Sequence, residues 1–182
     1  AGGSTTIKNE DTYATCTAIM GRLNYTLMNR YFLTLSIRRD GYSAFGMENP
    51  YATFPSGALA WNLSDESFFN IKWINNLKVR ASYGINGNRD IGIYDALAKL
   101  ETNKYLTGST LISGIYSSSL ANQYLKWEKT KALNLGLDFS VLDSRLNGSV
   151  DYYSMITNDL LLKRSLPTII GYDNVMSNMG EL

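Results

Sequence analysis

Histidine is absent from the 182 residues of the sequence, and cysteine and proline are scarce, with one and three residues. A chain without histidine lacks the usual general base and the commonest metal ligand of proteins. The single cysteine, Cys16, cannot form an internal disulfide, and no second thiol is present to complete a metal site with it. We therefore expect no metal and no cofactor.

The sequence also has little net charge and no long apolar run. The formal net charge is +1, so the sequence carries no basic footprint for nucleic acid. No run approaches the roughly 18 apolar residues of a transmembrane helix, but strands of a membrane barrel alternate and escape such a search. The sequence does not begin with methionine and shows no signal peptide. We expect the interior of a longer chain or a processed start.

What the sequence does contain is a strict alternation of apolar and polar residues, which is the pattern of β-strands with one apolar face. The clearest case lies within residues 125–153. A turn at residues 142–145 pairs Val141 with Leu146 and Asp138 with Ser149, and this register keeps each face uniform. The pattern predicts a β-hairpin. Its first strand has an apolar face made of Leu133, Leu135, Leu137, Phe139 and Val141.

The same alternation recurs towards the N-terminus. Residues 13–27 and 31–38 form a second predicted hairpin, in which Tyr25 pairs with Leu33 on the apolar face. Two more strands are predicted at residues 54–63 and 77–86. With the hairpin of residues 125–153 this makes six strands, and a seventh is expected near Asn178. The sequence therefore predicts an all-β fold, an antiparallel up-and-down meander.

The connections between these strands alternate in length. Tight turns are predicted at residues 28–30 and 142–145, and a moderate connection at 64–76 is expected to hold a short helix with Ser64 as its N-cap. The connections at residues 40–53, 87–124 and 158–177 are long. Consecutive connections of a meander lie at opposite ends of the sheet, so one rim carries the short turns and the other every long loop. Outer-membrane barrels show this asymmetry.

Strand length helps to decide which solvent the apolar face meets. Residues 133–141 match the roughly 9–11 residues that a tilted strand needs to cross a bilayer, whereas strands of globular proteins average about 5–6. The polar faces carry Ala, Gly, Ser, Asn and Thr with few charges, which suits a lumen, and Trp127 is expected at the level of the membrane interface. These features favour a large transmembrane β-barrel with long extracellular loops. A soluble β-sandwich, either an adhesion or a carbohydrate-binding module, is the alternative.

Six segments then carry a closer resemblance. From about residue 22 to the C-terminus the sequence resembles the barrel region of SusC/RagA-type TonB-linked (TonB-dependent) outer-membrane transporters. The segments occur in the family's order and at its separations. They are RRDGYSAFG (38–46), FPSGALAWNLSDESF (54–68), LKVRASYGINGN (77–88), LKWEKTKALNLGLDFSVLDSRLNGSVDYY (125–153), TNDLLL (157–162) and LPTIIGY (166–172).

The resemblance implies a bacterial outer-membrane barrel of about 22 strands with a plug in its lumen. It also implies a SusD-like surface lipoprotein that lids the barrel, and an inner-membrane TonB complex that drives import of large nutrients, either glycan oligomers or peptides. Residues 1–182 are expected to form a partial barrel of six to seven strands, roughly a third of the whole. The plug domain and the TonB box are expected to be absent from this chain.

Three groups of candidate functional residues follow from the pattern and the resemblance. Aromatic residues on the long-loop rim can stack on sugar rings or peptide side chains, although packing among the loops and against the lid is the favoured explanation for any one of them. These are Tyr42, Phe45, Tyr51, Tyr94, Tyr105, Tyr116 and Tyr124. The residues expected to face lipid are Leu133, Leu135, Leu137, Phe139 and Val141. Those expected to face the lumen are Arg22, Arg38, Asp138 and Asp151.

The two aspartates invite an enzymatic interpretation, because they share the polar face of adjacent strands. A glycosidase needs two carboxyl groups across a substrate, one of them with a raised pKa. No third polar group is expected to point there, and the resembled family is not enzymatic. We therefore expect no enzymatic activity. The two aspartates are instead expected to form hydrogen bonds with neighbouring residues or with a plug, and Arg22 and Arg38 are available to pair with them.

Overall fold

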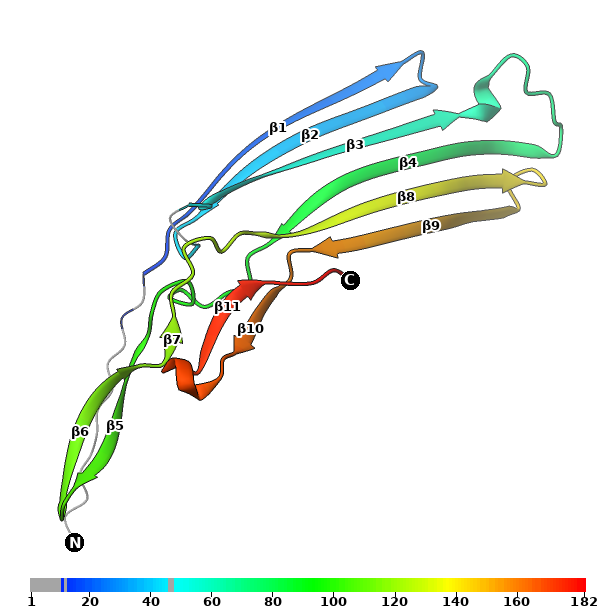
Figure 1. Ribbon diagram of the computed structural model, residues 1–182. Coiled ribbons are helices and arrows are strands. Elements are labelled where there is room, and N and C mark those ends of the chain that lie inside the picture. Colours follow the sequence, from blue (N-terminus) through cyan, green and yellow to red (C-terminus); the bar gives the residue numbers. More distant parts are fainter. Residues whose placement is uncertain (1–10, 12, 46–47) are drawn as a thin grey trace, which may run out of the picture.

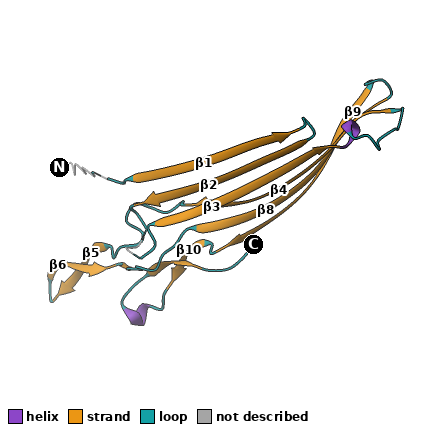
Figure 2. Cartoon of the chain, turned by 90° about the horizontal axis from the view of Figure 1, so that it is seen from above, coloured by secondary structure: helices purple, strands orange, loops and turns teal. Residues whose placement is uncertain are grey.

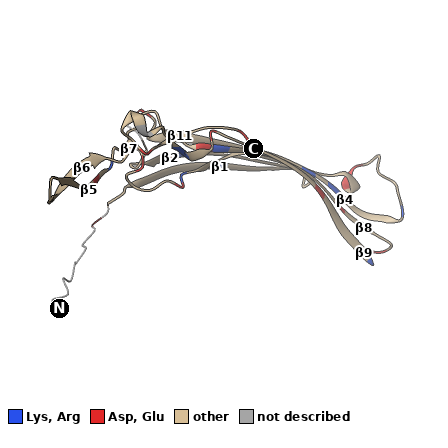
Figure 3. Ribbon diagram, turned by 60° about the horizontal axis from the view of Figure 1, so that its bottom comes forward, with Lys and Arg blue, Asp and Glu red and all other residues tan. Residues whose placement is uncertain are grey.

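The computed structural model describes residues 11, 13–45 and 48–182. Within these residues, six long antiparallel strands form one sheet in the order β1-β2-β3-β4-β8-β9 (Figure 1). They are β1 (Cys16–Leu27), β2 (Tyr31–Tyr42), β3 (Tyr51–Asn62), β4 (Ile74–Asn88), β8 (Glu128–Val141) and β9 (Leu146–Asn158). Figure 3 shows the sheet nearly edge-on as a single bent layer. The all-β antiparallel meander is confirmed, and over the described part of the chain the sheet stays open, with β1 and β9 as its edges.

The register of both predicted hairpins is confirmed. Val141 lies opposite Leu146 and Asp138 opposite Ser149 between β8 and β9. Between β1 and β2, Tyr25 lies opposite Leu33. Any register shifted by one residue would turn the apolar set of one strand to the polar face, which explains why the alternation alone predicted these pairs.

The loops hold more structure than the sequence indicated. β5 (Leu100–Thr107) and β6 (Thr110–Ser117) form a separate hairpin within the connection from β4 to β8. A small sheet in the order β10-β11-β7 joins β10 (Leu161–Ser165), β11 (Asn174–Asn178) and β7 (Ser119–Leu120), with the short turn η2 (Thr168–Ile170) between β10 and β11. β11 ends at Asn178 and pairs with β10 and β7. Beyond it the chain reaches β9, where Glu181 forms an antiparallel bridge with Asn158 and Leu182 exchanges two backbone hydrogen bonds with Thr157. The seventh strand expected to begin near Asn178 is therefore present as this short contact with β9. These small strands gather beyond one end of the long ones (Figure 2).

The predicted difference between the two rims is present. The turns at residues 28–30 and 142–145 and the connection at 63–73 lie at one end of the sheet, the turn rim, and the long connections lie at the other, the loop rim (Figure 1). The helix predicted after residue 64 is a 3₁₀ turn, η1 (Leu63–Asp65). Its N-cap is Asn62 rather than Ser64, with no side-chain cap bond, because Ser64 lies inside the turn. The described residues include no helix long and apolar enough to cross a membrane.

Most apolar side chains of the sheet are exposed. Leu133, Leu135 and Leu137 lie on one face with 37%, 44% and 38% of their surface exposed. The buried core instead lies at the loop rim and consists of Ala44, Phe45, Phe54, Ile91, Ala96, Leu125 and Trp127. A β-sandwich would cover the apolar face with a second sheet. The part of the chain seen here places no second layer on that face.

Candidate functional site

The polar face of the sheet is satisfied largely by hydrogen bonds between neighbouring strands. Thr34 Oγ1 donates to Asn24 Oδ1 at 3.0 Å, and the hydroxyl groups of Ser36 and Ser56 lie 2.7 Å apart. Small polar side chains that pair in this way leave few unsatisfied groups on this face. Two groups of ion pairs lie on this face, one near each rim.

Near the turn rim, one arginine bridges two aspartates. Arg80 donates from Nε to Asp138 Oδ2 and from Nη2 to Asp138 Oδ1, both at 2.8 Å. The same Nη2 lies 3.2 Å from Asp151 Oδ1. The structure therefore brings together the two aspartates predicted to share a face. Both carboxylates accept hydrogen bonds from one guanidinium, an arrangement unlike two carboxyl groups placed across a substrate.

The arginine in this triad is not one that the sequence indicated. Arg38 pairs with Asp40 instead, with Nε 2.6 Å from Oδ1, and Arg22 makes no ion pair with any residue that the structure describes. The expected partnership of Arg22 and Arg38 with Asp138 and Asp151 is therefore wrong, because β4, and not β1 or β2, lies beside β8. A signal for Arg80 existed, since it lies on the polar series of the predicted strand at residues 77–86.

A glycine makes the triad possible. Arg80 lies opposite Gly136 on β8, and Gly136 lies opposite Asp151 on β9, so the guanidinium must cross over residue 136 to reach Asp151. A Cβ atom at this position would lie 2.6 Å from Asp151 Oδ1 and 2.9 Å from Arg80 Cζ. A side chain at position 136 would therefore require the ends of Arg80 and Asp151 to shift from this geometry.

At the loop rim, β3 and β4 separate. Their pairing extends only from Ser56 and Gly84 towards the turn rim. Aromatic side chains fill the space beyond, where Phe45 stacks on Trp127 at a centroid distance of 4.9 Å and Phe54 meets Trp127 edge-on at 5.6 Å. Trp127 is only 3% exposed, so its expected place at the membrane interface is wrong. It precedes β8 and packs into the gap between the diverging strands.

Beside this aromatic cluster lies a polar hollow of about 360 Å³, which we call the rim hollow. Asp40, 8% exposed, lines it together with its partner Arg38. Trp127 also lines it, and its indole Nε1 is buried with no hydrogen-bond partner among the residues described. The remaining walls come from Phe54, Asn86, Gly87, Asn88 and Arg89. Planar polar groups next to aromatic rings are common in sites for polar organic ligands.

The loop aromatics do not form one surface. Tyr42 and Phe45 pack together at 5.9 Å beside the buried cluster, and the Arg89 guanidinium lies over the Tyr42 ring. Tyr51 lies on the apolar face of β3 with Arg39 over its ring. Tyr94 and Tyr124 are exposed, as are Tyr105 and Tyr116 on the β5–β6 hairpin. Their contact with a substrate or lid stays a prediction, as do the lipid-facing role of residues 133–141 and the lumen-facing role of the charged residues.

Comparison with known proteins agrees with this arrangement. A family model described as "TonB dependent receptor-like, beta-barrel" matches residues 2–181. TonB-dependent receptor P3 of Formosa agariphila is 43% identical over 166 residues, which cover 91% of this chain and 17% of that protein. TonB-dependent receptor SusC of Bacteroides thetaiotaomicron is 37% identical over 186 residues, which cover 97% of this chain and 18% of that protein.

Solved structures show the same likeness. A chain from the structure of the RagAB peptide transporter superposes with a TM-score of 0.80 at 30% identity, covering 92% of this chain and 18% of that one. A chain from the RagAB peptide importer in its "closed-closed" state gives a TM-score of 0.79 at 31% identity, covering 91% of this chain and 18% of that one. The chain thus spans less than a fifth of the length of each of these proteins.

Proposed function

Because the chain belongs to the TonB-dependent receptor β-barrel family, we propose that it forms one section of the wall of an outer-membrane importer. In this function the apolar face of the six-stranded sheet contacts lipid and the polar face lines the lumen or packs on a plug. The turn rim then lies towards the periplasm and the loop rim towards the cell exterior. No bond is made or broken, and the chain is not an enzyme.

The observation that carries this proposal is the sheet itself. It is a single layer with an exposed apolar face and a polar face closed by hydrogen bonds between small side chains. An isolated sheet of this kind in water would expose an apolar surface far larger than soluble monomers tolerate. In a barrel wall the same surface is covered by hydrocarbon. Closure with the remaining strands also removes the two open edges at β1 and β9.

For the whole protein we propose import of large nutrients through the barrel, with a SusD-like surface lipoprotein as lid and TonB as the source of energy. The likeness to SusC and to a peptide transporter solved as RagAB supports this class of cargo, either glycan oligomers or peptides. In this chain, the exposed aromatics of the loop rim are the proposed contacts with cargo or lid, and Tyr124, Tyr51 and Tyr105 are the most exposed of these candidates.

The experiment that tests the proposed function uses the full-length protein that contains this segment. Outer membranes are isolated, and boiled and unboiled samples are compared on a detergent gel. A band in that fraction whose mobility changes on boiling is expected, because a closed barrel resists detergent until it is heated. A soluble protein without such a shift would overturn the proposal and would make residues 133–141 part of a protein core.

A further inference from the structure

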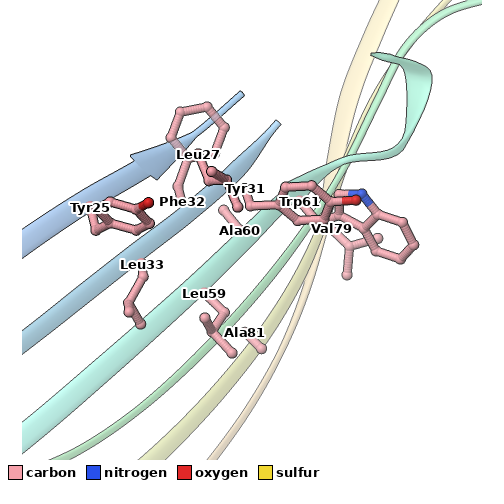
Figure 4. A pocket seen from close by; sticks show the side chains of 10 residues that line it. All are labelled: Tyr25, Leu27, Tyr31, Phe32, Leu33, Leu59, Ala60, Trp61, Val79 and Ala81. Carbon is pink, nitrogen blue, oxygen red and sulfur yellow. The ribbon is translucent and has the colours of Figure 1, made fainter. Parts of the chain in front are cut away.

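The apolar face of the sheet is hollowed close to the turn rim. A groove of about 490 Å³ lies there across β1, β2, β3 and β4, and we call it the turn-rim groove (Figure 4). Two consecutive rows of register partners line it. One row is Tyr25, Leu33, Leu59 and Ala81, and the other is Leu27, Tyr31, Trp61 and Val79. The lining is almost entirely apolar, so the groove suits a hydrocarbon chain.

A carboxylate holds the two aromatic rings at the rim end of the groove. Tyr31 and Trp61 stack at 6.0 Å, and both donate to Glu66 Oε1, from the Tyr31 hydroxyl at 2.6 Å and from the Trp61 indole at 3.0 Å. These hydrogen bonds, from Tyr31 first and then from Trp61, lower the pKa of Glu66 in spite of its burial. Because the polar atoms of both rings turn to Glu66, the rings present apolar surface to the groove.

A cation lies at the same end. Arg30 donates from Nη1 to Glu66 Oε2 at 3.3 Å, and its side chain is 37% exposed. Its other side-chain N–H groups have no hydrogen-bond partner among residues 11, 13–45 and 48–182. A guanidinium with free donors is a favourable partner for a phosphate group. Exposed Phe68 and Trp73 lie in the connection between β3 and β4 that also holds Glu66, as expected of aromatics at the level of lipid headgroups.

We propose that the turn-rim groove is a specific seat for one phospholipid of the periplasmic leaflet, with an acyl chain in the groove and the headgroup phosphate at Arg30. This proposal rests on the proposed function, because the groove meets lipid only if the apolar face lies in a membrane. A second protein chain is the less suitable occupant. Apart from the Tyr25 hydroxyl, the groove walls offer no polar group to pair with a protein backbone, whereas an acyl chain needs none.

Two substitutions test the two halves of the seat, and a third serves as a control. Ala81→Phe replaces a small side chain in the groove wall by a ring that fills the groove. Val150→Phe adds the same ring on β9, in the register row that continues from Val79 through Leu137 but outside the groove. Arg30→Gln removes the charge and keeps a donor for Glu66.

The measurement is native mass spectrometry of the full-length protein released from detergent micelles that contain phosphatidylethanolamine or, in parallel, uncharged diacylglycerol. We expect the wild-type protein and V150F to retain one phosphatidylethanolamine. For A81F we expect about tenfold lower occupancy at subsaturating lipid, because about two buried methylene groups are worth that much. R30Q should lose phosphatidylethanolamine while its retention of diacylglycerol stays unchanged.

Equal phosphatidylethanolamine occupancy in wild type, A81F and V150F would overturn the seat, and so would equal loss in both phenylalanine variants. Each sample is also run boiled and unboiled on a detergent gel. A mobility shift with equal occupancy rejects the lipid seat and leaves the importer intact. Absence of a shift in the wild-type protein rejects the proposed function, and the lipid seat with it.

Discussion

Replacing Gly136 by alanine tests whether the polar face depends on the Arg80 triad. A Cβ atom there would lie 2.6 Å from Asp151 Oδ1 and 2.9 Å from Arg80 Cζ, so the guanidinium must move away. A hydrogen bond to a charged group contributes about 1.5–3 kcal/mol, but ion pairs between exposed side chains contribute about 0–1 kcal/mol. Arg80 and Asp138 are both 37% exposed and fall between these limits. We expect G136A to lower the free energy of unfolding by about 1–2 kcal/mol.

The assay is urea unfolding of the full-length protein in detergent, in which the folded fraction is read from the heat-modifiable gel band. Gly21→Ala is the matched control, because the nearest atom to its new Cβ is Ile37 Cγ2 at an ordinary 3.9 Å. G21A should stay within about 0.5 kcal/mol of wild type. In an Arg80→Met background the cost of G136A should shrink, since the displaced guanidinium is gone. Equal effects of G136A and G21A would refute the role assigned to this glycine.

Three further predictions use the same assay. Leu135→Arg should lower the free energy of unfolding by about 2–4 kcal/mol and the adjacent Asn134→Arg by much less, since only residue 135 lies on the proposed lipid face. Similar losses in both variants would contradict that assignment. Trp127→Ala should lower the free energy of unfolding by about 3–5 kcal/mol, and Trp127→Phe by clearly less, because the indole Nε1 has no partner among the described residues. Equal losses would contradict this account of the indole. Glu66 has a folded-state pKa below its ordinary 4.5, so the stabilisation that its carboxylate contributes should be complete above pH 4.5 and disappear as the pH falls through the lower value. In a Glu66→Gln variant the free energy of unfolding should therefore depend less on pH in the acid range. An unchanged dependence would exclude Glu66 as the titrating group.

The candidate site was only partly predictable. Asp138 and Asp151 could be placed on one face because they lie on adjacent strands joined by a tight turn, where the alternation determines the register. Their arginine was not singled out, although the predicted meander already places the strand at residues 77–86 beside the strand that holds Asp138. The contact of Arg80 with Asp151 also requires a side chain that crosses β8, and it does so over Gly136.

Trp127 shows why local pattern fails at the end of a sheet. By parity it belongs to the apolar series of Leu133 and Leu135, and the sequence therefore predicted an interfacial side chain. Parity predicts direction only while the strands stay paired. Beyond Ser56 and Gly84 the strands β3 and β4 diverge, and the ring fills the gap with Phe45 and Phe54.

The amino-acid sequence by itself determined the all-β meander, the two faces, the hairpin registers and the unequal rims. Each of these follows from the side-chain period of two and from the lengths of local connections. The tertiary structure alone decided the Arg80 triad over Gly136, the aromatic cluster at Trp127, and the turn-rim groove held by Glu66. These features join residues on strands or turns that are distant in the chain. Their contacts depend on where neighbouring strands separate and on which side chains reach across an intervening strand, which no local period encodes.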